Sequence, residues 1–159
     1  SGDDQVINAE DMWVMPGIIE AHCHIGITEE KKGTEGDDCN EMTNPVTPYV
    51  RAIDAINPLD PAFHNAIAAG ITSVMSGPGS SNVVGGQFAF MKTHGRVIDK
   101  MVMLAPAAMK VSFGENPKNF YKEMNMPPAT RMGTASLLRE ELFQAAKYKK
   151  KKNLRRISG

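Results

Sequence analysis

The feature that most constrains this chain is a pair of histidines, His22 and His24, at the end of an apolar run. In an extended strand alternate side chains share a face, so the two imidazoles point the same way while Cys23 points to the other face. Neutral imidazole suits zinc and related divalent ions, and two such groups on one rigid strand form half of a metal cage. The same spacing is also found where two histidines are simply polar residues near the end of a strand and bind no metal. The flanking residues therefore decide between the two interpretations.

The residues around the pair extend the pattern. Residues 14–26 have the sequence VMPGIIEAHCHIG. This sequence resembles the first barrel strand of the amidohydrolase superfamily, whose usual motif is Pro-Gly-Phe/Leu-Ile-Asp-x-His-x-His. Residues 69–74, AGITSV, are similar to the second strand of that family, and the likeness covers residues 5–125. Within the superfamily, residues 57–63 and 114–118 resemble the imidazolonepropionase-related hydrolases. Glu20 stands where the family usually carries Asp, and a carboxylate there can still orient an imidazole.

The resemblance implies an α/β fold of the (β/α)₈ TIM-barrel type. A complete barrel needs about 250 residues, whereas this chain has 159. We therefore expect a partial barrel of about three βα units behind a short N-terminal lead-in strand, with the family's remaining histidine and aspartate ligands further along a longer protein. The expected organisation is a lead-in over residues 1–11, an incomplete barrel over 12–147 and a basic tail over 148–159.

Local signals predict alternating strands and helices. Asp60 as N-cap, Pro61 at the first helical position and Gly70 as the stop predict a helix over residues 60–70. Gly95 is interpreted as a helix cap, with His94 in the last turn of that helix. A further helix, expected to pack on the sheet, is predicted over residues 134–147. The predicted strands cover residues 12–27, 71–75 and 100–115.

Two polar loops follow the first two predicted strands, and in a barrel both would lie on the catalytic face. Residues 28–48 show no apolar period, so they form either a functional loop or a surface insertion. Residues 77–87 are rich in glycine but lack the Gly-Lys-Ser/Thr of a phosphate loop and the third glycine of the dinucleotide fingerprint. These glycines either let backbone approach a ligand or form a tight turn.

Two further residues are candidate metal ligands by resemblance. A two-metal site needs a bridging anionic oxygen, and the superfamily takes it from a carbamylated lysine or a glutamate. Lys110 lies in an apolar run, where an unpaired ammonium would be costly. Glu115 lies at the expected end of the third strand and is slightly preferred, although either side chain can equally be a surface charge at the rim. The candidate metal ligands are therefore His22, His24, Glu115 and Lys110.

Composition limits the partners and the compartment. Lys plus Arg equals Asp plus Glu at 18 each, so no global field favours nucleic acid or a membrane. Residues 147–156 hold seven basic side chains, which we interpret as a solvated end because Tyr148 is their only aromatic neighbour. No apolar run is long enough for a membrane span. The chain has two cysteines, Cys23 and Cys39, and their spacing is typical neither of a disulfide framework nor of a cysteine-based zinc site. We therefore expect both to be free thiols, in a cytoplasmic protein.

These observations lead to one expected function and one alternative. By resemblance, the parent protein is a hydrolase that holds a divalent ion, zinc by preference, with one or two ions in the complete site. The ion would activate water to attack an amide or cyclic amide of a small-molecule substrate. The chain by itself is expected to be inactive. The alternative is a non-catalytic module that binds metal weakly or self-associates, because a partial barrel leaves sheet edges and apolar faces open.

Overall fold

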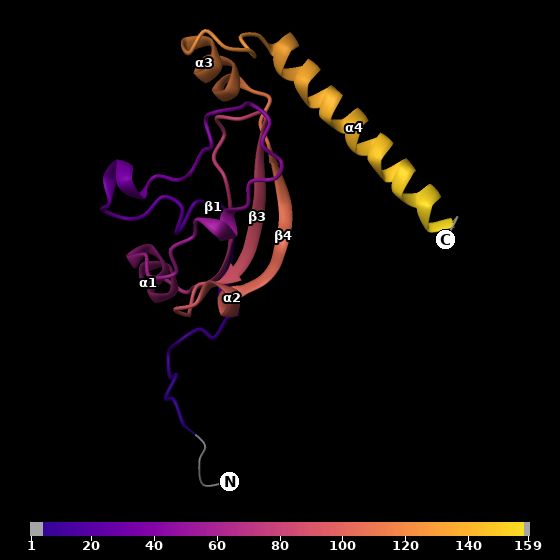
Figure 1. The fold of residues 1–159 in the computed structure, drawn as a ribbon. Helices are drawn as coiled ribbons and strands as arrows, with labels where there is room; N and C mark the ends of the chain where they lie inside the picture. The colour runs from indigo at the N-terminus through magenta and orange to yellow at the C-terminus, as the bar shows by residue number, and fades with distance from the viewer. Residues whose placement is uncertain (1–4, 158–159) are drawn as a thin grey trace.

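The computed structural model describes residues 5–157, and of residues 154–157 only the backbone. Its centre is a four-stranded sheet in the order β1-β2-β3-β4 (Figure 1). The strands are β1 Ile18–Cys23, β2 Ile71–Ser76, β3 Val84–Lys92 and β4 Val102–Val111. The helices are α1 Pro61–Ala68, α2 Ile98–Met101, α3 Glu115–Glu123 and α4 Arg131–Ile157, with 3-10 turns η1 Gly33–Gly36 and η2 Ala52–Asp54.

The strand directions confirm one βα unit and correct the others. β1 and β2 are parallel and α1 lies in the connection between them, as predicted. β3, however, is antiparallel to β2, and β4 is antiparallel to β3. The connections over residues 77–83 and 93–101 are shorter than the dozen or more residues that a parallel crossover needs, so the chain has to turn back. In place of the three parallel βα units that we expected, the structure therefore has a mixed α/β sheet with one parallel pair of strands.

Three other predictions are corrected. Residues 5–17 contain no strand where a lead-in strand was expected. β3 occupies the residues that were expected to lead into a helix capped by Gly95. Glu115 begins α3 instead of ending a strand. In the expected outer segments 1–11 and 148–159, residues 1–4 and 158–159 lie outside the described residues.

The predicted helix over residues 134–147 is present but longer, because α4 runs on through much of the expected basic tail. It does not pack closely on the sheet. Figure 1 shows α4 leaving the body beside α3 and diverging from β4 along its length. Leu142 on this helix is accordingly 63% exposed.

The core lies on the side of the sheet that faces α1 and the long loop (Figure 1). The edge strands β1 and β4 are mostly exposed, whereas β2 and β3 are mostly buried. Buried apolar side chains from the sheet, α1, α2 and the loops form one cluster, which contains Ile27, Ala52, Ile56, Phe63, Val74, Ala89, Met91 and Met101.

Asp60 joins this core to the end of β1. It is 2% exposed, and its carboxylate accepts a hydrogen bond from the backbone N–H of Ala62 at 3.0 Å, which confirms it as the N-cap of α1. The same carboxylate also accepts hydrogen bonds from the backbone N–H groups of Gly26 and Glu30, each at 3.1 Å. One buried side chain therefore fixes both the start of α1 and the turn that follows the histidines.

The Asp60→Ala substitution should lower the free energy of unfolding by about 2–4 kcal/mol, because it removes a helix cap and leaves buried N–H donors without a partner. Urea denaturation followed by circular dichroism measures this change. Asp99→Ala, at an exposed position in the first turn of α2, is the control and should change stability by less than about 0.5 kcal/mol. Equal effects of the two substitutions would contradict the role assigned to Asp60.

Candidate metal-binding site

The two histidines lie together at the carboxyl end of β1. His22 is on the strand and His24 directly follows it, so alternation places both rings on one side. Their ring centroids are 5.2 Å apart and the ring planes are 84° to each other. Nδ1 of His24 lies 2.6 Å from the carbonyl oxygen of Gly77. Because a carbonyl only accepts, Nδ1 carries the hydrogen, and Nε2 of the neutral ring is left with its lone pair for a ligand.

The parallel pairing of β1 with β2 supports this arrangement. Beyond the Cys23–Ser76 register pair, the N–H of Gly77 donates to the carbonyl of Cys23 at 3.2 Å. The hydroxyl of Ser76 donates to the carbonyl of Ile25 at 2.7 Å. A Cβ atom at Gly77 would overlap the ring of Phe88, so only glycine brings this carbonyl so close to His24. The same Phe88 ring lies 5.4 Å from the ring of His22.

The spacing of the rings is compatible with one shared zinc ion. Zinc lies about 2.0–2.1 Å from a histidine nitrogen, which puts each ring centre about 3.2 Å from the ion; at a tetrahedral angle of about 109° the two centres are then about 5.2 Å apart. The observed separation is 5.2 Å. Over residues 5–157, however, no three His, Cys, Asp or Glu side chains come together as a metal site. The pair therefore fits two positions of a coordination shell and not a whole one.

The surroundings of His22 favour its neutral form. Burial, followed by the Lys110 ammonium and the neighbouring His24, lowers the pKa of His22 below its ordinary value of 6.5, and Glu20 partly opposes this. A neutral ring is the form that binds a metal ion. Glu20 does not orient an imidazole as the resemblance suggested. Its carboxylate instead accepts a hydrogen bond from the backbone N–H of His22 at 3.0 Å.

The two remaining candidates lie in different surroundings. Lys110 is a half-buried residue of β4 whose charge acts on His22, and burial lowers its own pKa, with a smaller opposing effect from Cys39. Glu115 is exposed at the start of α3 and forms an ion pair with Lys118, which holds the pKa of its carboxyl below the ordinary range. The structure thus brings Lys110, and not the preferred Glu115, into electrostatic reach of His22.

The long loop after β1 is fastened to the glycine-rich loop after β2. The N–H of Gly79 donates to the carbonyl of Cys39 at 2.8 Å, and the N–H of Ser81 donates to the Asn40 side chain at 3.0 Å. Between the loops is a cavity of about 550 Å³, with Asp37, Asp38, Asn40, Tyr49, Pro78 and Gly85 in its lining. The glycine-rich residues therefore do more than form a turn, because they hold the long loop beside the site.

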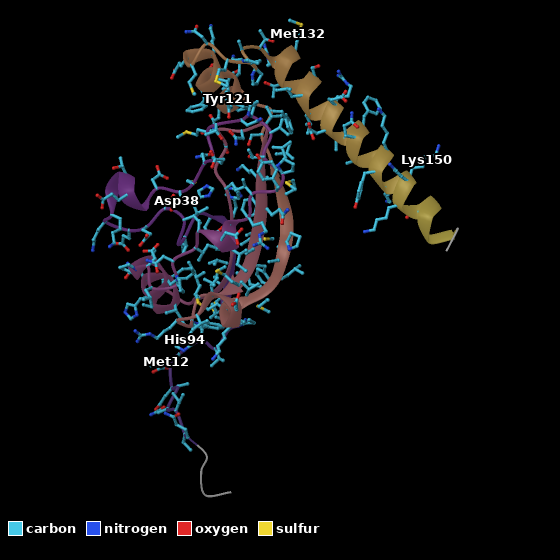
Figure 2. The ribbon with its side chains drawn as sticks, viewed as in Figure 1. Met12, Asp38, His94, Tyr121, Met132 and Lys150 are labelled. Atoms are coloured by element: carbon cyan, nitrogen blue, oxygen red, sulfur yellow. The ribbon has the colours of Figure 1, made fainter. Side chains whose placement is uncertain are left out.

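A buried polar network that the sequence analysis missed completes this support. The Tyr121 hydroxyl donates to the Asn82 side chain at 2.6 Å, and the Asn82 amide donates to the carbonyl of Glu41 at 2.5 Å and to the Thr47 hydroxyl at 3.0 Å. Tyr121 is fully buried, and burial raises its pKa to about 12 (Figure 2). No local signal identifies this network, since its members come from α3 and two separate loops.

Comparison with known proteins relates the chain to amidohydrolases. The chain is 33% identical over 156 residues to the amidohydrolase tasK of Hapsidospora irregularis, a match that covers 91% of this chain and 16% of that protein. It superposes on the crystal structure of an amidohydrolase from Thermotoga maritima with a TM-score of 0.84 and 47% sequence identity, over 88% of this chain and 37% of that one. The chain is a homologue of amidohydrolases. No family model matches it, and it spans only 16% and 37% of the lengths of these two relatives.

None of the helices that the structure describes in this amidohydrolase homologue is long and apolar enough to cross a membrane.

The titration of His22 tests the electrostatics of the site. Because its pKa in the folded chain is below 6.5, the folded state binds fewer protons than the unfolded state near pH 6. The contribution of the neutral His22 ring to stability is complete above the unfolded pKa of 6.5 and declines as the pH falls toward the lowered pKa of the folded chain.

Two substitutions test the charges that act on His22. Lys110→Met should raise the pKa of His22, and Glu20→Gln should lower it further. Ring resonances followed by NMR across pH 4–9 would measure both, with Lys100→Met, an exposed cation of α2, as the control; equal shifts for Lys110→Met and Lys100→Met would contradict the assignment.

Proposed function

We propose that His22 and His24 supply two ligands of a divalent metal site, zinc by preference, in an amidohydrolase that cleaves an amide or cyclic amide C–N bond of a small molecule. The observation that carries this proposal is the pair itself: two rings 5.2 Å apart, one of them fixed through Nδ1 by the Gly77 carbonyl. The names of the homologous proteins support the reaction class. The substrate and the number of ions belong to the proposal.

The residues of this chain have distinct tasks in that proposal. The carbonyl of Gly77 sets the tautomer of His24, so that Nε2 would be the nitrogen that holds the ion. Lys110, through its charge, disfavours protonation of His22 near neutral pH, so that the ring is ready to bind. A bound ion would supply Lewis-acid activation of water and of the substrate carbonyl.

Lys110 is the better candidate for a third metal-site residue. Its half-buried position on β4 and its effect on His22 favour it over Glu115, whose carboxylate is paired with Lys118. This reverses the preference drawn from the sequence. To become a ligand, Lys110 would have to lose its charge and with it its effect on the pKa of His22, so the two roles exclude each other at any one time; burial lowers the pKa of Lys110 in the direction of the neutral amine.

Zinc binding tests the proposal. Because two imidazoles fill only part of a tetrahedral shell, the chain should bind one zinc ion weakly near neutral pH. Replacing both His22 and His24 by Ala should weaken that binding at least about tenfold. The control replaces His64 and His94 by Ala, since both are exposed and lie outside the pair. Calorimetry in which the two double variants bind zinc equally well would contradict the site, and so would tight binding by the unaltered chain, which requires ligands that the pair does not provide.

The activity of the chain is a separate prediction. Hydrolysis needs an activated water, a polarising centre and a proton acceptor held together, and the residues described here bring only two metal ligands into one place. The chain with added zinc should therefore show no turnover of amides, dipeptides or cyclic amides. Turnover that disappears in His22→Ala would contradict this expectation and would locate a complete site within the chain.

A further inference from the structure

An apolar groove of about 400 Å³ lies between α4 and the sheet, and neither His22 nor His24 lines it. Its apolar lining comes from the end of β4, the start of β3 and the inner side of α4, namely Val84, Met109, Val111, Leu138, Leu142 and Tyr148. Met109 and Leu142 remain 44% and 63% exposed. Such a volume is large enough for an aromatic side chain, and apolar surface left open at this scale marks an interaction site.

A second unpartnered apolar feature is the extended segment before β1. Four consecutive side chains, Met12, Trp13, Val14 and Met15, are between 67% and 96% exposed, with Trp13 the most exposed. Two acidic residues, Glu10 and Asp11, precede them. A run of exposed apolar residues on an irregular segment is costly in water unless another surface covers it.

The segment and the groove have opposite charges. Lysines at positions 147 and 149–152 surround Tyr148 at the open end of the groove, and all of them are exposed. The acidic residues next to Trp13 would face this basic block if Trp13 entered the groove. Glu141 is the one acidic residue among those that line the groove. Charge complementarity of this kind selects the partner and its orientation.

Trp13 cannot reach the groove of its own chain. Ile18 pairs with Ile71 at one end of the sheet, whereas the groove lies at the other end, where Val84 pairs with Val111. β3 has nine residues, so the sheet is roughly 30 Å long. Trp13 is five residues before Ile18 and extends at most about 17 Å from it. Figure 2 shows Met12, the neighbour of Trp13, at the opposite end of the molecule from Met132, near the start of α4.

We infer that Trp13 and its apolar neighbours dock into the groove of a second copy of the chain, with Glu10 and Asp11 facing the lysines of that copy's α4. The docking covers in one step the exposed segment of one copy and the open face of α4 in the other. This assigns a specific surface to the self-association that the sequence suggested in general terms.

Trp13 is the only tryptophan of the chain, so its fluorescence reports this contact directly. Its emission maximum should move to shorter wavelength as protein concentration rises, in step with a rise in sedimentation coefficient. Leu142→Glu should raise the dissociation constant about tenfold or more, because it removes an apolar contact and adds a carboxylate in the path of an acidic segment. High salt and the double charge reversal Glu10→Lys, Asp11→Lys should weaken association as well.

The control is Phe143→Glu, the neighbouring position on α4. Phe143 is 58% exposed, close to the 63% of Leu142, but it does not line the groove. It should leave both the emission shift and the sedimentation behaviour intact, and because both sites are exposed, neither variant should unfold. Three results would overturn the inference: a chain that stays monomeric, association without any change in Trp13 emission, or equal effects of the two glutamate variants.

Discussion

The parallel pairing of β1 with β2 is the constraint on which the candidate site depends. It brings the carboxyl ends of two strands to one edge, so that the residues after each strand meet. There the carbonyl of Gly77 reaches Nδ1 of His24, and Phe88 fills the space that a side chain at Gly77 would need. The strand alone would place two imidazoles on one face. The pairing fixes the tautomer of one of them and so makes the pair a credible metal ligand set.

The other parts of the fold support this edge from two sides. Asp60 fastens the turn after β1 to the start of α1, and the network of Tyr121, Asn82 and Thr47 fastens the long loop to the glycine-rich loop. Hydrogen bonds among buried polar groups hold their members in one arrangement because an unmade bond there is costly. The periphery is less constrained. β1, β4 and α4 leave apolar side chains in water, and the groove under α4 is the place where such side chains from β4 and α4 lie together.

The sequence correctly predicted those features that residues close together in the chain determine. Asp60, Pro61 and Gly70 define α1 through capping, and alternation along β1 predicts that His22 and His24 share a face. β3 itself was not predicted, and β4 was expected to be parallel to its neighbour, because strand pairing depends on distant partners and only the short connections between strands indicate it. The contact between His24 and Gly77 joins residues 53 apart, and the Tyr121 contact joins residues 39 apart. No periodicity encodes such pairs, so the sequence alone offers no physical ground for ranking Lys110 against Glu115.

The most direct test of the account is the protonation state of the two histidine rings, read by long-range proton–nitrogen NMR before and after zinc is added. The account predicts that neutral His24 carries its hydrogen on Nδ1, where the Gly77 carbonyl accepts it, and has a free Nε2. Zinc should then shift the ring nitrogens of His22 and His24 together. A His24 ring protonated on Nε2, or zinc that shifts neither ring or only one, would contradict the claim that these two side chains form one metal site.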